Sequence, residues 1–375
     1  MQGGWLDQFY RRVAAAPKAE PETPAPAEAP GNVSRRGFIQ SGLASGVTAG
    51  MAAGGMLAQT QVAQAQATGD TPIGPKWWPS RWGPQDEAGA SNWITPAKVL
   101  EAARLIKTGK IYDIGRVYQA EMPLFGARVF AVRIPGTPTG GPFGKNKLVY
   151  HDEFVSTEIG QVGTQFDGLG HIGCVTGKDG DMNEMRFYNG FTEAEMANAY
   201  GLQKLGIEKL KPFFTRGILV DVAGLKGRML NVGEEITVAD VQAALQRANI
   251  AEGSIRSGDA VFFNTGFGDL WMKDNAKFNS GQPGIGLDVA RWCVAKELAL
   301  VGSDTWATEV VPNPPNPDLA FVVHNELITK NGILNHENLD FTELIKDKIF
   351  EFVYVFAPLR IKGATGSPGR PIAIV

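Results

Sequence analysis

The sequence is poor in the residue types that build disulfide-rich or zinc-bound scaffolds. It has only two cysteines, Cys174 and Cys293, among 375 residues. Two cysteines so far apart form neither a disulfide framework nor a zinc knuckle; we expect both to be buried free thiols, and a single disulfide is the alternative. Histidine is scarce as well, with four residues in the whole chain. A histidine in a polar, glycine-rich stretch is therefore a candidate functional residue.

The sequence also lacks strong charge and familiar nucleotide-binding motifs. Its formal net charge is −3, which gives no reason to expect nucleic acid or an acidic membrane as a partner. It contains no Walker loop, dinucleotide fingerprint or internal repeat. Hydrophobic residues make up 43% of the chain, as in ordinary globular proteins. These absences give no reason to expect a nucleic acid or nucleotide partner; a small-molecule substrate is what the family resemblance described below implies.

The N-terminal part has two segments that do not resemble a folded domain. Residues 1–33 include a run of Pro, Ala and Glu from Pro17 to Pro30, which we expect to be a disordered extension. The next residues, Ser34-Arg35-Arg36-Gly37-Phe38-Ile39-Gln40, precede an apolar run rich in alanine and glycine. This combination resembles a twin-arginine export signal.

We therefore expect residues 34–67 to be a signal peptide and the mature protein to be periplasmic. The small residues from Ala63 to Ala67 suit signal peptidase, so cleavage is expected near Ala67. The apolar run from Ser41 to about Leu57 is too short and too rich in glycine to be a good membrane span. No membrane association is expected after cleavage, although an uncleaved anchor is an alternative.

A glycine-rich stretch, residues 160–173, is the most distinctive feature of the remaining chain. Five of its fourteen residues are glycine, which disfavours a helix. Glycine instead favours a tight loop whose backbone can lie close to a neighbouring group. One interpretation is a turn whose polar side chains cap its own backbone. The other is a site, because hydrogen-bonding and metal-ligating side chains stand between the glycines: Gln161, Thr164, Gln165, Asp167 and His171.

The rest of the chain alternates between segments typical of strands and of helices. Apolar runs predict buried strands at residues 217–223, 258–266 and 300–306, and alternation predicts further strands at 111–118 and 350–356. Helix caps and apolar periodicity predict helices at residues 95–109, 201–210, 237–248 and 287–298. Residues 134–147, rich in proline and glycine, are expected to form a long loop, plausibly a flap over a site.

The glycine-rich stretch resembles the signature of the cyclase family, metal-dependent hydrolases that include bacterial kynurenine formamidases and isatin hydrolases. That signature reads His-x-Gly-Thr-His-x-Asp-x-x-x-His, and Gly163, Thr164, Asp167 and His171 match it at the right spacing. Further similar segments run along the mature chain in the family's order, among them Gly302-Ser303-Asp304-Thr305-Trp306 and Gly363-Ala364-Thr365-Gly366-Ser367-Pro368.

The resemblance implies a fold, a ligand set and an assembly. The fold is α/β, with a mixed-sheet, barrel-like β core and flanking helices, in one domain over residues 68–375. Asp167 would hold a divalent metal ion together with His324 and Glu337, which match the family's later His and Glu ligands. His171 matches the position assigned to proton transfer. Relatives of this kind usually form a homodimer or a higher oligomer such as a homotetramer.

Two residues depart from the family signature at positions that usually hold metal ligands. Gln161 and Gln165 stand where two histidine ligands are usual. A glutamine oxygen is a weaker and harder ligand than imidazole, so zinc affinity should fall. The site could hold one metal through Asp167, His324 and Glu337. It could instead hold a harder ion such as manganese with both glutamines as ligands, or no metal at all.

The sequence thus predicts an exported hydrolase that acts on a C–N bond, or on a lactone, by means of metal-activated water. Manganese and zinc are the expected metals. The alternative is a periplasmic small-molecule-binding protein or inactive relative without metal. Aromatic residues near the expected pocket favour an apolar or aromatic substrate, and the predicted substrate-binding residues are Phe166, Tyr188, Asp304 and Trp306.

Overall fold

The structure, a computed structural model, describes residues 71–177 and 181–375, which belong to one compact unit. The predicted extension (1–33) and signal peptide (34–67) lie outside the described residues. Within the described part, no helix is both long enough and apolar enough to cross a membrane. Cys174 and Cys293 are free thiols. Cys293 is buried as expected, whereas Cys174 is only half-buried.

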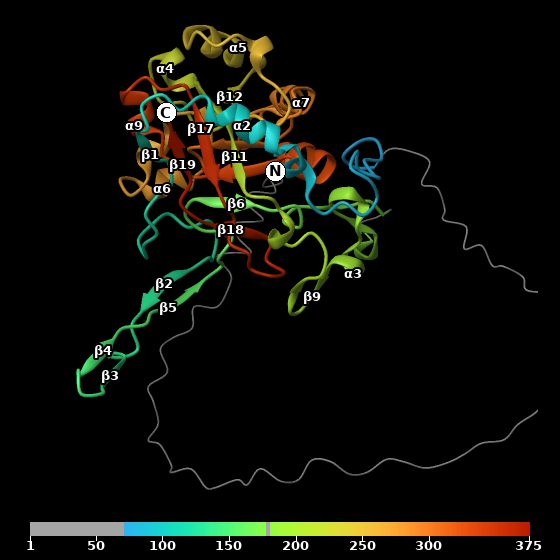
Figure 1. Cartoon of the computed structure of the whole chain (residues 1–375). Coiled ribbons are helices and arrows are strands. Elements are labelled where there is room, and N and C mark those ends of the chain that lie inside the picture. Colours follow the sequence, from blue (N-terminus) through green and yellow to red (C-terminus); the bar gives the residue numbers. More distant parts are fainter. Residues whose placement is uncertain (1–70, 178–180) are drawn as a thin grey trace, which may run out of the picture. The chain divides into compact units, whose positions relative to one another are not determined.

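A nine-stranded sheet forms the centre of this unit (Figure 1). In spatial order its strands are β1 (Ile111–Asp113), β19 (Ile372–Ile374), β17 (Glu351–Phe356), β11 (Phe213–Asp221), β13 (Ala260–Asn264), β15 (Leu300–Ser303), β16 (Leu334–Glu337), β6 (Gln165–Asp167) and β18 (Gly366–Pro368). The four strands from β11 to β16 run parallel, and antiparallel strands extend the sheet on both sides. This curled, mixed sheet with flanking helices confirms the predicted fold class.

Helices cover the sheet and explain why its central strands are almost wholly apolar. The α-helices are α2 (Pro96–Ala103), α3 (Glu193–Met196), α4 (Val222–Lys226), α5 (Val238–Arg247), α6 (Asn275–Phe278), α7 (Leu287–Ala295), α8 (Val322–His324) and α9 (Thr342–Lys346). Short 3-10 helices are η1 (Gly89–Trp93), η3 (Met182–Glu184), η4 (Tyr188–Gly190), η5 (Ile207–Lys209), η6 (Glu252–Ser254) and η7 (Phe267–Leu270); η8 (Asn325–Lys330) is a π-helix. Helices α2 and α5 both pack against β11.

Local chemistry sets the predicted starts of two helices. The Thr95 hydroxyl accepts a hydrogen bond of 3.2 Å from the backbone N–H of Lys98, as an N-cap should. Thr237 and Asp240 form a reciprocal capping box, because the backbone N–H of each is bonded by the side chain of the other. Both helix starts were predicted from these residues and are confirmed.

Several predicted elements are wrong or too long, and the helix predicted for 95–109, for example, ends at Ala103. The segment 201–210 is not a helix but a short strand, β10 (Gly201–Leu202), followed by η5. Gly201 and Leu205 adopt φ values of +111° and +59°, which a right-handed helix does not allow. The strand predicted for 111–118 ends at Asp113. Further on, the backbone N–H of Arg116 donates to the Thr164 hydroxyl instead of to a neighbouring strand.

Residues 129–159, called the arm below, extend away from the body as two successive two-stranded ladders (Figure 1). β2 (Phe130–Arg133) pairs with β5 (Phe154–Thr157), and β3 (Gly140–Phe143) pairs with β4 (Leu148–Tyr150). The loop predicted for 134–147 is therefore partly a hairpin, and it projects outward instead of folding over the body. Three further small pairs are β7 (Cys174–Val175) with β8 (Met185–Arg186), β9 (Ala197–Asn198) with β10, and β12 (Glu235–Ile236) with β14 (Gly284–Ile285).

Candidate metal centre

The antiparallel pairing of β6 with β16 places four polar side chains together. Asp167 lies opposite Asn335, and Gln165 lies opposite Glu337. Side chains alternate between the two faces of a strand, so these four residues share one face of the sheet. All four are buried. The glycine-rich stretch is thus not only a loop, because a fully buried strand runs through its centre.

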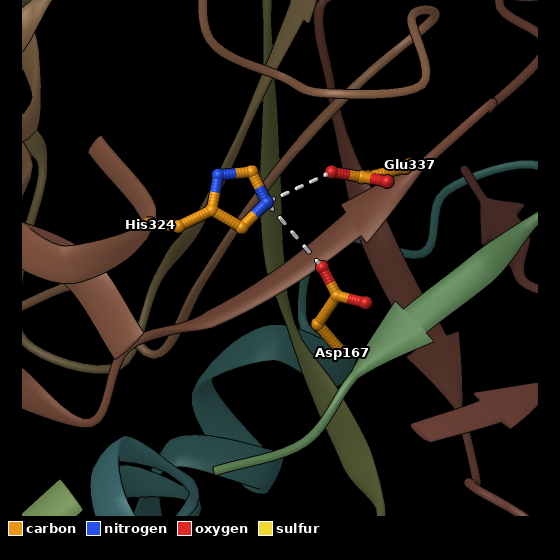
Figure 2. A group of neighbouring side chains, drawn as sticks. All are labelled: Asp167, His324 and Glu337. Carbon is orange, nitrogen blue, oxygen red and sulfur yellow. Dashed lines mark hydrogen bonds and ion pairs between the residues drawn. The ribbon is translucent and has the colours of Figure 1, made fainter. Parts of the chain in front are cut away.

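His324 reaches this cluster from helix α8. Its Nε2 lies 3.2 Å from Glu337 Oε1 and 3.7 Å from Asp167 Oδ2 (Figure 2). Ligand atoms of the three residues all lie within 4.8 Å of one another. One imidazole nitrogen and two carboxylate oxygens form a donor set suited to zinc or manganese. Helix α8 continues directly into the π-helix η8, a rare geometry that is frequent at functional sites.

Glu309 fixes the orientation of the His324 imidazole by contacting its Nδ1 atom. Its Oε1 lies 2.5 Å from His324 Nδ1 and also accepts a hydrogen bond of 3.1 Å from the His324 backbone N–H. A carboxylate that accepts from Nδ1–H leaves Nε2 free to bind a metal, which is the usual arrangement behind a metal-bound histidine. Sequence reasoning missed Glu309, which lies next to a proline-rich loop that carries no motif.

Asn335 joins the two carboxylates. Its Nδ2 donates to Glu337 Oε1 at 2.8 Å and to Asp167 Oδ2 at 3.1 Å. The Thr308 hydroxyl donates to Asn335 Oδ1 at 2.7 Å and so fixes the direction of the amide. This residue was also missed, although a signal was present. It precedes Glu337 by two positions and therefore had to share its face of the strand.

The two glutamines that replace the signature histidines both lie beside the carboxylates. Gln165 Nε2 donates to Glu337 Oε2, and Gln161 Nε2 lies 3.4 Å from Asp167 Oδ1. Gln161 Oε1 is buried and has no hydrogen-bond partner within the described residues. Such an atom is costly to bury unpaired. A cation bound by the carboxylates and the Gln161 oxygen would satisfy it, so the residues present fit a metal ion.

His171 lies at the edge of the cluster. Its Nε2 is 3.8 Å from Asp167 Oδ1, and its side chain is 20% exposed, whereas Asp167 is fully buried. Burial lowers the pKa of His171, and His324 and Arg128 lower it further, although Asp167 opposes them. His171 is therefore a neutral imidazole near pH 7. A neutral imidazole can accept a proton from a neighbouring water molecule.

The pKa values of the three candidate ligands are shifted in different directions by their mutual contacts. Burial lowers the pKa of His324, but its hydrogen bonds to Asp167, Glu309 and Glu337 outweigh burial and raise it well above 6.5. Burial and the neighbouring Asp167 raise the pKa of Glu337 to about 7. Burial acts to raise the pKa of Asp167, yet His171, His324 and Asn335 together leave it lowered. The cluster thus has excess negative charge that protons, or a cation, can balance.

Two predicted substrate contacts are core residues instead. Phe166 faces the opposite side of β6 from Asp167 and is wholly buried, with its ring 5.0 Å from that of Phe356. Tyr188 is 1% exposed, and its hydroxyl donates to Asp86 at 2.8 Å. The alternation of the strand explains Phe166, and the anchoring hydrogen bond explains Tyr188. His336 also faces the core and bonds to Tyr354, as its position next to Glu337 in a strand predicts.

The other two predicted substrate contacts lie apart from the ligands. Trp306 stacks on Phe125 at 4.4 Å and reaches His324 only through the ring of Phe321, which lies 5.5 Å from the imidazole. Asp304 lines a separate cavity of about 250 Å³, together with Arg116, at the ends of the parallel strands. Its carboxylate accepts hydrogen bonds from Thr265 and from the backbone N–H of Gly268, so we assign it a structural role.

Comparison with known proteins agrees with this geometry. The model of the family described as "Putative cyclase" matches residues 112–310, just over half of the chain. A crystal structure of a novel cyclase is 32% identical in sequence, with a TM-score of 0.67, and the match covers 78% of this chain and 96% of that one. Comparison with curated proteins gave no match.

A more distant structure shares the fold. Isatin hydrolase A from Ralstonia solanacearum is 20% identical, with a TM-score of 0.51, and the match covers 75% of this chain and 96% of that one. The family match includes the glycine-rich stretch and ends before helix α8, and the match to the 32% identical structure covers 78% of the chain. The chain belongs to the cyclase family.

Proposed function

We propose that the chain is an exported, metal-dependent hydrolase that opens an amide, lactam, formamide or lactone. The observation that carries the proposal is the convergence of Asp167, His324 and Glu337, whose ligand atoms lie within 4.8 Å of one another. The Glu309 carboxylate binds His324 Nδ1, and His171 lies beside Asp167. Isatin hydrolase A, which has the same fold, is by its name a hydrolase, and this supports the reaction class.

Asp167, His324 and Glu337 would hold a divalent cation, and the oxygens of Gln161 and Gln165 would add to them. This set contains one nitrogen and up to four oxygens. Oxygen-rich sites favour manganese over zinc more than histidine-rich sites do. We therefore propose Mn²⁺ as the first candidate and Zn²⁺ as the second. The buried, unpartnered oxygen of Gln161 supports the participation of that side chain.

A divalent cation bound here would act as a Lewis acid and lower the pKa of water. Residues of the chain would then transfer the proton from water to the leaving group. His171 Nε2 takes a proton from the attacking water and returns it to the leaving nitrogen. The C–N bond breaks, and a carboxylate and an amine form. Glu309 keeps His324 Nε2 directed at the cluster. Asn335 donates to both carboxylates and so holds them next to each other.

An aromatic substrate is the proposed class because aromatic rings lie next to the ligands. Phe321 contacts the His324 imidazole edge-on, and Trp306 and Phe125 lie beyond it. Phe321 was not among the residues that the sequence suggested for this role, whereas Trp306, which lies behind it, was. Arylformamides, cyclic imides and aromatic lactones are the compounds to screen. Hydrolysis of none of them under metal-loaded conditions would argue against the proposed substrate class.

Export to the periplasm by the twin-arginine route is the second part of the proposal. It is supported by Arg35-Arg36 and by the apolar, glycine-rich run that follows. Replacing both arginines with lysine should leave the full-length precursor in the cytoplasm, as cell fractionation would show. Export of the double variant at the unchanged rate would contradict the route.

The first test of the function is elemental analysis of the exported protein, purified without chelator or a metal-binding tag. One divalent ion per chain, with thermal stabilisation on adding Mn²⁺ or Zn²⁺, is the expected result. Repeated absence of metal without stabilisation would favour the second candidate, a small-molecule-binding protein or inactive relative. One observation favours that candidate: amide N–H groups of Gln165 and Asn335 already bond to the buried carboxylates.

A further inference from the structure

The imidazole of His171 has no hydrogen bond of its own within residues 71–177 and 181–375. Its Nε2 only approaches Asp167 Oδ1, at 3.8 Å. On the N-terminal side the backbone is held, because the N–H of His171 donates to the Gly168 carbonyl at 3.1 Å and the N–H of Gly168 donates to the Thr365 carbonyl at 2.9 Å. The direction of the imidazole therefore depends on what holds the backbone that follows it.

The π-helix η8 holds the backbone that follows His171. The Thr329 hydroxyl donates to the carbonyl oxygen of Ile172 at 3.1 Å, and Asn325 Nδ2 donates to the carbonyl oxygen of Gly173 at 3.3 Å. Asn325 Nδ2 also lies 3.3 Å from Thr329 Oγ1, so the two side chains form one connected network. Thr329 is wholly buried, so its hydroxyl depends on a protein partner. Two successive carbonyls are thus bound to the same helix.

Glycines on both sides of the pair His171-Ile172 make such anchors necessary. A Cβ atom at Gly173 would lie 2.7 Å from the ring of Phe187, and one at Gly170 would clash with the side chain of Leu202. Only glycine fits these two close approaches. Glycine is also conformationally permissive. The pair between the two glycines therefore needs contacts from outside the segment to keep one orientation.

The same helical segment carries the candidate ligand His324, which directly precedes η8. Thr329 follows His324 by five positions. In an α-helix two residues five apart are rotated from each other by about 140° around the axis, because each residue turns the chain by about 100°. A π-helix, with its i→i+5 hydrogen bonds, brings such residues closer to one side. The π-helix thus allows one segment to present both a ligand to the cluster and a hydroxyl to the backbone beside His171.

We propose that Thr329, supported by Asn325, is a positioning residue for His171. Its hydroxyl fixes the segment that carries the acid–base imidazole relative to the helix that carries His324. The spacing between the proton-transfer group and the candidate metal centre is set by this hydrogen bond. The effect on turnover rests on the proposed function, whereas the anchoring of His171 is measurable without any turnover.

Labelling of the Mn²⁺-loaded full-length protein with diethyl pyrocarbonate tests the anchoring. The chain has four histidines, of which His324 and His336 are buried and His151 is exposed, so His151 is an internal reference. Thr329→Val keeps the shape of the side chain and removes the hydroxyl. It should raise the labelling rate of His171 relative to His151 at least about threefold, because the freed segment opens more often. Peptide mass spectrometry measures the rates, and Thr329→Ser, which keeps the hydroxyl, should retain the wild-type ratio.

Hydrolysis of formanilide, an arylformamide, by the same variants tests the effect on turnover. Thr329→Val should lower kcat about 10- to 100-fold and change KM little, because a displaced acid–base group slows the chemical step more than it weakens substrate binding. Thr329→Ser should restore most of the activity. Thr215→Val is the matched control, since Thr215 is equally buried and its hydroxyl donates to the Gly258 carbonyl at 2.6 Å, in a strand that carries none of the candidate ligands. It should change neither kcat nor the labelling of His171.

Unchanged labelling of His171 in Thr329→Val, or an equal rise in Thr215→Val, would overturn the proposal. A Thr329→Ser protein that behaves like Thr329→Val would also overturn it, because the effect would then not depend on the hydroxyl. Asn325→Ala removes the second hydrogen bond from a half-buried side chain and should raise the labelling rate as well, which keeps the test decisive if Thr329→Val does not fold. A wild-type protein that hydrolyses no arylformamide would count against the proposed function alone, and the labelling result would still decide the anchoring.

Discussion

Gln165 and Glu337 lie directly opposite each other in β6 and β16, and the Gln165 amide N–H donates to the Glu337 carboxylate. Asn335 donates to the other oxygen of the same carboxylate at 2.8 Å. In the absence of a cation, amide donors thus stabilise a buried acid. If Gln165 were to coordinate a cation here, its amide would have to present its oxygen where it now presents its N–H group.

The first prediction concerns this pair of glutamines. Replacing Gln161 and Gln165 together by histidine should raise zinc affinity at least about tenfold, because imidazole binds zinc more strongly than an amide oxygen does. Competition with a chromogenic chelator measures the change. Gln203→His, an exposed substitution away from the cluster, is the control. Unchanged zinc affinity in the double variant would show that the two side chains do not reach the metal.

The sequence was informative about side-chain positions where strand alternation determines the face of the sheet on which each residue lies. Strand alternation makes Gln165 and Asp167 neighbours on one face and sends Phe166 and His336 to the other. The same rule explains why Phe166 was wrongly placed at the substrate. Its nearness to Asp167 in the sequence suggested a shared site, but adjacent residues of a strand point in opposite directions.

Other features depended on tertiary contacts that no local pattern reports. Glu309 meets His324 across fifteen residues of mostly irregular chain, and only the packed structure brings them together. The outward course of the arm was equally hidden, because proline and glycine in residues 134–147 suggested a loop. Its β3–β4 pairing depends on cross-strand contacts such as the stacked rings of Phe143 and Tyr150, 6.1 Å apart.

The second prediction concerns Glu309. Glu309→Gln keeps an acceptor oxygen near His324 Nδ1 but removes the negative charge. Metal affinity should fall roughly 10- to 100-fold, as for other partners of metal-bound histidines. Calorimetric titration with Mn²⁺ measures the loss, and circular dichroism checks the fold. Glu326→Gln removes a carboxylate paired with Lys330 on the neighbouring π-helix and should leave affinity unchanged. Equal effects of the two substitutions would contradict a specific role for Glu309.

The third prediction concerns stability and pH in the presence of chelator. The pKa of Glu337 is raised from 4.5 to about 7, and that of His324 is raised well above 6.5. Both groups bind their protons more tightly in the folded state, so their contribution is fully present at low pH. It is lost as pH rises through the folded values. His171 and His336 have lowered pKa values and act in the opposite direction, but only below about pH 6.5.

Above pH 6.5 the chelated protein should therefore lose stability as pH rises towards about 8. Saturating Mn²⁺ should reduce or reverse this slope, because the cation binds the deprotonated ligands. Urea unfolding at several pH values measures both effects. Glu337→Gln should flatten the slope near pH 7 in chelator. Stability that rises with pH in the chelated wild-type protein would show that Glu337 and His324 do not have the raised pKa values given above.

The last prediction separates proton transfer from metal binding. His171→Ala should lower turnover roughly 10²- to 10⁴-fold, the usual contribution of a general acid–base residue. Its Nε2 lies 3.8 Å from Asp167, too far for a direct hydrogen bond, and its side chain is more exposed than those of the candidate ligands. Metal content, measured by elemental analysis on the same sample, should therefore stay close to one ion per chain. An active variant would remove His171 from the mechanism, whereas an inactive variant that has lost its metal would make His171 a ligand instead of an acid–base group.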